Sequence, residues 1–147
     1  MKHLEPEINI NLQVTTRIES IKKLKKWLIF IANKEKKNLS SLTYTLVSDL
    51  YLLKMNQEIL NHDYLTDIIT FDLSDKKYDI EGDIYISYDR VKENARVFHV
   101  KQMEELRRVF AHGLLHLIGY KDKEIEDIKT MRKKEDYYLN KYNTIYK

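Results

Sequence analysis

Hydrophobic and polar positions along the chain follow two different repeats. Short apolar runs and every-second-residue alternation predict strands at 8–15, 42–48, 67–73 and 82–87. Apolar residues at helical spacing predict helices that begin after 16 and reach 31, and that span 49–61, 88–97, 102–118 and 124–142. The pattern therefore predicts an α+β fold, with one mixed sheet of about four strands covered by helices.

Small polar residues mark the expected helix starts. Thr16 and Glu19 have the spacing of a capping box, which predicts that the first helix opens there. Ser48 or Asp49 is expected to cap the second helix, and Ser87 the third. The 102–118 helix has the longest helical signal, and its expected apolar face comprises Met103, Leu106, Phe110, Leu114, Leu117 and Ile118.

Length and composition fit one globular domain, expected to span 1–147. Apolar residues make up 43% and charged residues 33%, and the 3 glycines and 1 proline leave no flexible linker. With 0 cysteines, disulfides and thiolate metal ligands are excluded. We expect a cytoplasmic protein without a membrane partner, because the N-terminus has no apolar signal segment and no apolar run reaches the roughly 18 residues of a membrane span.

The positive charge of the chain is mild. A net charge of +3 permits an RNA or phosphate partner without requiring one. The lysine-rich run at 22–26 is interpreted as the solvated face of a helix in preference to an RNA-binding patch.

Two histidines at helical spacing are the main chemical signal. His112 and His116 lie one turn apart, about 5–6 Å between Cβ atoms, which is the arrangement that a metal ion needs. Gly113 is expected to let other backbone approach the helix, and Gly119 to end it. The following turn would bring Asp122 back toward the pair. Two histidines and one carboxylate would leave a coordination position for water, as in catalytic sites.

The spacing of the histidines alone does not decide between metal binding and ordinary packing roles. An i, i+4 pair of histidines is a short motif and occurs in helices without metal. A metallopeptidase of the HExxH type is disfavoured, because Gly113 stands where those enzymes carry their glutamate base.

Three ordered segments resemble a known family. "HGLLHLIGYKD" (112–122) is similar to the signature H-G-x-L-H-L-x-G-Y-D-H of the YbeY endoribonucleases. "LTDIITFDL" (65–73) and "EGDIYIS" (81–87) resemble two further family segments, and Asn56 stands where the family has an upstream asparagine. The resemblance implies a zincin-like α+β domain that is a metal-dependent, single-strand endoribonuclease of 16S rRNA 3′-end maturation and ribosome quality control.

The resemblance also implies a set of metal ligands. The family holds its ion with three histidines, which correspond here to His112, His116 and, in place of the third histidine, Asp122. One divalent ion is expected, and zinc suits two nitrogens and a carboxylate, although nickel and iron compete for such donors. His62 is a weaker candidate for an extra ligand.

The chain departs from the family at a basic residue. An arginine that the family uses for RNA cleavage corresponds to Leu60, and the sequence does not decide which cation replaces it. The nearby candidates are Arg90, Arg96, Arg107, Arg108 and Lys121.

Charged residues around the signature have two interpretations each. Lys121 and Lys123 are candidates for RNA phosphate contacts, or are solvated surface lysines. Asp67 and Asp83 are expected to orient a histidine or cap a turn. The implied partners are the 16S rRNA precursor and the small ribosomal subunit or its assembly factors. Two alternatives stay open: another zincin-like metallohydrolase, and a non-catalytic ribosome assembly factor with a structural metal.

Overall fold

The structure is a computed structural model, and it describes residues 5–61, 66–75 and 79–146. Elements follow one another as strands and helices first and helices last, as the sequence pattern predicts. In chain order they are β1 (Glu7–Leu12), α1 (Ile21–Lys34), β2 (Asn38–Val47), α2 (Asp49–Glu58), β3 (Ile68–Asp72), β4 (Asp79–Ser87), α3 (Tyr88–Phe98), α4 (Gln102–Ile118), α5 (Ile125–Lys141) and a π-helical turn (Tyr142–Tyr146). His62 and Leu65 lie outside the described residues.

Within the described residues, four strands form one mixed sheet in the order β1-β2-β4-β3. β1 pairs in parallel with β2, and β2 pairs in parallel with β4. β3 pairs antiparallel with β4 and is an edge strand. The predicted α+β fold with a mixed four-stranded sheet is therefore confirmed.

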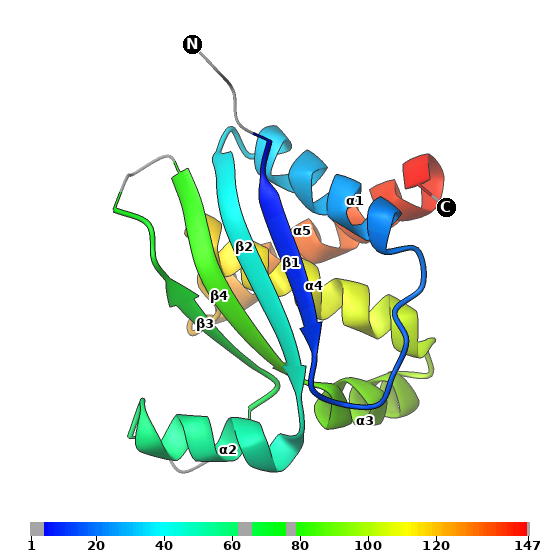
Figure 1. The fold of residues 1–147 in the computed structure, drawn as a ribbon. Coiled ribbons are helices and arrows are strands. Elements are labelled where there is room, and N and C mark those ends of the chain that lie inside the picture. Colours follow the sequence, from blue (N-terminus) through cyan, green and yellow to red (C-terminus); the bar gives the residue numbers. More distant parts are fainter. Residues whose placement is uncertain (1–4, 62–65, 76–78, 147) are drawn as a thin grey trace.

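Helices cover the two faces of the sheet unequally. Figure 1 shows α1, α4 and α5 behind the sheet, with α2 at the end where β2 finishes. The main core lies between the sheet and this helical layer, and it buries Trp27, Tyr44, Phe110 and Tyr138 completely. A small second core of Val47, Leu52 and Ile69 lies under α2 on the opposite face. Along β4, Ile84 and Ile86 join the main core and Tyr85 packs against the second one, because strand side chains alternate between the two faces.

Helix α4 is the central helix and contacts α1, α3, α5, β3 and β4. Of its expected apolar face, Leu106, Phe110 and Leu114 are buried, and the other members pack against the core as partly buried residues. The buried hydroxyl of Tyr44 on β2 donates to the carbonyl of Phe110 at 2.8 Å, and the two rings stack at 4.0 Å. This bond fixes the position of α4 relative to β2 at Phe110, two residues before His112.

The predicted starts of α2 and α3 are confirmed. The hydroxyl oxygen of Ser48 accepts from the backbone N–H of Tyr51, and that of Ser87 accepts from the N–H of Arg90. The capping box predicted at Thr16 is wrong, because α1 begins at Ile21. Ile18 is buried in the core, so the segment 13–19 must cross to the helical layer before the helix can begin.

The lysine-rich run at 22–26 is mainly solvated, as expected, with Leu24 as its buried member. Tyr138 and Tyr142 of the last helical segment are core residues. Among the residues that the structure describes, no helix combines the length and the apolar character that crossing a bilayer requires.

Candidate metal centre

The two histidines of the candidate site project from the same side of α4. Their rings lie 4.5 Å apart between centroids and meet edge to face at 84°. Gly113 between them faces the sheet: a Cβ there would lie 2.9 Å from the Cδ1 of Ile68 and 3.0 Å from that of Ile84. The expectation that backbone approaches at Gly113 is corrected, because the close neighbours are side chains of β3 and β4. The glycine lets α4 pack near the edge of the sheet.

A tight turn after α4 brings the third side chain to the histidines. Gly119 adopts φ 127°, a conformation that side-chain-bearing residues rarely adopt. The N–H of Gly119 bonds the carbonyl of His116 at 3.0 Å, and the N–H of Tyr120 bonds that of Leu115 at 3.0 Å. This pair of bonds ends the helix as a Schellman motif does and reverses the chain toward α4, so that Asp122 returns to the histidines.

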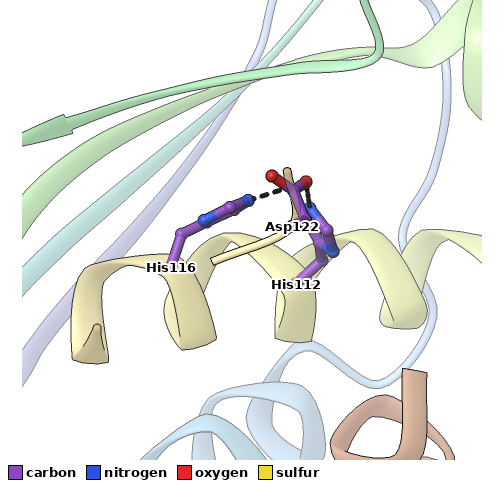
Figure 2. Close-up of side chains that lie close together, drawn as sticks. All are labelled: His112, His116 and Asp122. Carbon is purple, nitrogen blue, oxygen red and sulfur yellow. Dashed lines mark hydrogen bonds and ion pairs between the residues drawn. The ribbon is translucent and has the colours of Figure 1, made fainter. Parts of the chain in front are cut away.

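His112, His116 and Asp122 converge on one point (Figure 2). Asp122 Oδ2 lies 3.3 Å from the Nε2 of His112 and 3.2 Å from the Nε2 of His116. One ligand atom from each residue lies within 4.8 Å of the others. Bonds of about 2.0–2.2 Å to a tetrahedral zinc ion would separate the ligand atoms by about 3.4 Å, so both histidine–aspartate distances fit such an ion.

The second nitrogen of each imidazole is occupied by an acceptor. The Nδ1 of His112 lies 2.6 Å from a carboxylate oxygen of Glu135, and the Nδ1 of His116 lies 3.0 Å from the carbonyl of Tyr120. Because both partners are acceptors, each Nδ1 is the nitrogen placed to donate, and each Nε2 is the atom that a neutral ring would offer to a cation beside Asp122. Metal-binding histidines are usually oriented in this way. The donor set therefore fits a divalent ion.

Negative charge around His112 favours a cation at this point. Burial lowers the pKa of His112, but the hydrogen bond and charge of Glu135, with the charges of Asp67 and Asp122, outweigh burial and raise that pKa above its usual value. The same carboxylates that stabilise an imidazolium would stabilise a bound metal ion.

Glu135 on α5 is itself held in place. Its side chain is nearly inaccessible, and its Oε1 accepts a hydrogen bond from Arg108 at 2.9 Å. Arg108 also donates to Asp136 at 2.7 Å. The arginine thereby fixes the carboxylate that orients His112 and compensates part of the charge of the buried Glu135.

The turn that carries Asp122 is anchored to two helices. The hydroxyl of Tyr120 donates to Glu35 at 2.6 Å, and Lys134 donates to the same carboxylate at 3.1 Å. Tyr138 also donates to Glu35. Glu35, at the end of α1, thus links α5 to Tyr120, whose carbonyl orients His116.

Two pockets open on either side of the three side chains. One, of about 370 Å³, lies between α3, α4 and α5 and is lined by His112, Asp122, Phe98 and Arg132, among others. The other, of about 500 Å³, lies along β3 and is lined by the three candidate ligands, Leu60, Thr70 and Lys123, among others. The two pockets share Asp67, His112 and Asp122 in their linings, so both adjoin the candidate site.

The remaining predicted site residues separate into two groups. Asp67 and Lys123 line pockets at the site, and the charge of Asp67 acts on His112. Lys121 is exposed and lines neither pocket. Gly82 and Ile84 on β4 face α4, and strand side chains alternate between faces, so Asp83 points away from α4. The expectation that Asp83 orients a histidine is therefore corrected.

The basic candidates for the missing family arginine are placed differently. Arg90 pairs with Asp49 at 3.1 Å and Arg96 with Glu93 at 2.7 Å. Arg107 lies over the ring of Tyr142 at 4.3 Å. Among the five candidates, Arg108 lines the pocket beside the site. Leu60, which stands at the position of the family arginine, lines the other pocket together with Lys123.

Sequence reasoning missed Glu135. It lies 23 residues from His112 on another helix, within a run of charged residues that looks like a solvated helix face. The sequence contains one weak signal: Met131, Glu135, Tyr138 and Leu139 recur at helical spacing, and all four are buried.

The comparisons with known proteins agree with the sequence resemblance. A family model described as "Endoribonuclease YbeY" matches residues 7–143. A protein of that name from Cytophaga hutchinsonii is 56% identical over 117 residues, which cover 80% of this chain and 82% of the relative. Another from Flavobacterium psychrophilum is 43% identical over 136 residues, which cover 92% of this chain and 96% of the relative.

A solved structure has the same fold. The solution structure of a Thermotoga maritima protein is 33% identical in sequence and superposes with a TM-score of 0.62. The match covers 90% of this chain and 87% of that chain. These matches cover 80% or more of the chain, and they confirm the resemblance. The chain belongs to the YbeY endoribonuclease family.

Proposed function

We propose that this protein is a metal-dependent endoribonuclease that cleaves single-stranded RNA, with His112, His116 and Asp122 as the metal ligands. One observation carries the metal site: two imidazole Nε2 atoms and one carboxylate oxygen converge, while both Nδ1 atoms are hydrogen-bonded to acceptors. Family membership supports RNA as the substrate. We propose that residues 1–147 act as one such hydrolase domain.

The residues around the ligands suit phosphodiester hydrolysis. A divalent ion at this position would supply Lewis-acid polarisation of a phosphate oxygen and would lower the pKa of a coordinated water. Negative charge develops on the phosphate in the transition state, and nearby cations stabilise it. Lys123, which lines the pocket along β3, supports such a role for a cation at the site. We propose Lys123 as the phosphate contact on the β3 side, and Lys121, which lies one residue before Asp122, as an outer contact.

Zinc is the ion that we propose for this site. Two imidazole nitrogens and one carboxylate are donors that zinc accepts in tetrahedral catalytic sites. The observed histidine–aspartate separations of 3.2 and 3.3 Å match such a geometry.

We further propose the 16S rRNA precursor as the substrate and the small ribosomal subunit as the partner. The activity would then be exerted in the cytoplasm, where precursor ribosomal RNA is processed in bacteria. The positive net charge of +3 and the open pockets on both sides of the candidate ligands are compatible with a single strand that lies across the site.

Cleavage of a defined RNA by the zinc-loaded protein tests this proposal. The substrate is an end-labelled single strand that contains the 3′ end of 16S rRNA and its precursor extension, and the same sequence in duplex form is the comparison. We expect cleavage of the single strand and a loss of rate by more than about 100-fold in His116→Ala, because loss of a ligand weakens the site more than loss of an orienting partner does.

The matched control is His99→Asn. His99 is an exposed histidine in a left-handed conformation (φ 57°) that asparagine tolerates, and it does not line either pocket. The His99→Asn variant should cleave the RNA at the wild-type rate. A wild-type protein with one equivalent of zinc and no RNA cleavage would overturn the nuclease proposal, as would cleavage that His116→Ala leaves unchanged.

A further inference from the structure

An exposed aromatic side chain lines the pocket between α3, α4 and α5. Phe98 closes α3 with 56% of its surface exposed, and it lines the same pocket as His112 and Asp122. Exposure of a phenyl ring costs hydrophobic free energy, so a ring beside a candidate catalytic centre is a natural contact for a flat, apolar ligand surface.

The pocket combines this ring with apolar walls and polar groups. Ile128 on α5 is a second exposed apolar side chain in its lining, and Val109 and Met131 are buried residues of the same lining. Asn94 and Glu105 add an amide and a carboxylate. A nucleobase has matching features, since its faces are apolar and its edge carries donors and acceptors.

A cation lies on the same pocket. Arg132 of α5 is 55% exposed at its side chain, and its contact with Glu135 is long, 3.7 Å. Its guanidinium is therefore available to a phosphate, whereas Arg108 is committed to Glu135 and Asp136 by bonds of 2.9 and 2.7 Å. An aromatic ring beside a basic side chain is the combination by which proteins bind unpaired nucleotides.

We propose that this pocket binds one unpaired nucleotide of the RNA substrate, with its base stacked on Phe98 and its phosphate on Arg132. The proposal rests on the proposed nuclease function and adds a subsite to it. The nucleotide would be a neighbour of the one whose phosphodiester lies at His112 and Asp122, because both residues line the same pocket of about 370 Å³.

Phe98→Ala tests the stacking, with Val97→Ala as the matched control. Val97 is the preceding residue of α3 and is exposed to a similar degree, 52%, but it does not line the pocket. The zinc-loaded proteins are compared for cleavage of the single-stranded RNA. We expect Phe98→Ala to raise KM about tenfold, as loss of one stacked base does, and Val97→Ala to leave KM unchanged. Bound zinc should stay the same in both.

Substrates that lack one base separate stacking from an indirect effect on the fold. An abasic site at the nucleotide that occupies the pocket should weaken wild-type binding about as much as Phe98→Ala does, and it should weaken Phe98→Ala no further. Scanning the abasic site along the RNA should find one such position next to the cleaved bond. Additive losses at every position would overturn the proposal.

Phe98→Trp provides a binding signal that does not depend on cleavage. The native Trp27 is fully buried, so an indole at 98 would be the exposed one among the described residues. Bound RNA should quench the fluorescence of this indole. Adding Arg132→Gln should weaken RNA binding several-fold. The control Lys133→Gln, at the adjacent position of α5 and outside this pocket, should leave RNA binding unchanged.

The outcomes distinguish the subsite from the nuclease itself. Quenching of the Phe98→Trp protein by RNA without any cleavage would retain the subsite and overturn the nuclease. Cleavage with an unchanged KM in Phe98→Ala would retain the nuclease and overturn the subsite. A mass in solution that falls from that of a dimer to that of a monomer in Phe98→Ala, with RNA binding unchanged, would show that a second copy of the chain covers the ring. This result would also overturn the subsite proposal.

Discussion

Glu135 joins the candidate metal site to the last helix at the scale of a single residue. Its carboxylate accepts from His112 at 2.6 Å and from Arg108 at 2.9 Å. Glu135→Gln should reduce zinc affinity about 10- to 100-fold. The amide of glutamine orients the imidazole of His112 less firmly, and the substitution removes the negative charge that raises the basicity of this ligand. Titration against a fluorescent zinc chelator measures the affinity.

The control for that variant is Asp136→Asn. Asp136 shares Arg108 with Glu135, but it contacts neither His112 nor His116. It should bind zinc with an affinity close to that of the wild type. Equal zinc affinities in Glu135→Gln and the wild type would show that the His112–Glu135 bond does not orient a ligand.

Lys121 and Lys123 differ by only two positions but occupy different surroundings. Lys123 lines the pocket along β3, and Lys121 lines neither pocket at the site. Lys123→Gln should lower the slope of RNA affinity against salt by about 0.7, the value for one phosphate contact on a single strand. Lys121→Gln should change it less. Equal slopes for both variants and the wild type would remove Lys123 from the RNA contact.

The convergence of the three candidate ligands could be predicted from the sequence because their geometry is local. His112 and His116 are one helical turn apart, and a single turn at Gly119 connects them to Asp122. Glu135 and Phe98 could not be found in this way, because only the packing of α3 and α5 against α4 brings them to the site.

At the scale of elements, Glu35 ties the end of α1 to α5 and to the turn after α4. Burial raises the pKa of Glu35, but hydrogen bonds from Tyr120, Tyr138 and Lys134 outweigh burial and lower it below the ordinary value of 4.5. A carboxylate with a lowered folded-state pKa stabilises the fold above about pH 4.5, and this contribution is lost as pH falls through the folded-state value.

Glu35→Gln should therefore destabilise the protein most at neutral pH. We expect a loss of about 2 kcal/mol at pH 7, since the variant removes charged hydrogen bonds. The difference from the wild type should shrink as the pH is lowered from 6 to 3. Urea unfolding at a series of pH values measures it. A difference that does not change with pH would mean that the charge of Glu35 contributes nothing to stability.

Element boundaries show where sequence patterns fail. The bounds of α4 were predicted correctly, and those of α3 to within one residue. β2 begins at Asn38, earlier than predicted, because its pairing with β4 continues across a bulge between Leu39 and Ser41. α1 begins later than predicted, because burial of Ile18 outweighs the local capping signal at Thr16.

At the scale of the whole molecule, the alternation of strands and helices predicts the fold class but not the order of the strands. The position of β3 at the edge, antiparallel to β4, depends on contacts between distant segments. That position leaves one pocket of the candidate site open along β3.

Zinc should stabilise the whole fold, because its proposed ligands come from α4 and from the turn that Glu35 anchors. At a free zinc concentration 100 times the Kd, the free energy of unfolding should rise by about 2.7 kcal/mol. Chelation should reverse the change, and Asp122→Asn should show a smaller one. Urea unfolding with and without zinc measures the effect, and equal midpoints would contradict binding to the folded state.

The central claim is that His112, His116 and Asp122 hold one divalent ion between them. The most direct measurement is the zinc bound per chain after dialysis against a low zinc concentration, determined by atomic emission for the wild type, His112→Ala, His116→Ala, Asp122→Asn and the control His99→Asn. The account predicts about one equivalent in the wild type and the control and much less in the three ligand variants. Full occupancy in the ligand variants, or no bound zinc in the wild type, would contradict it.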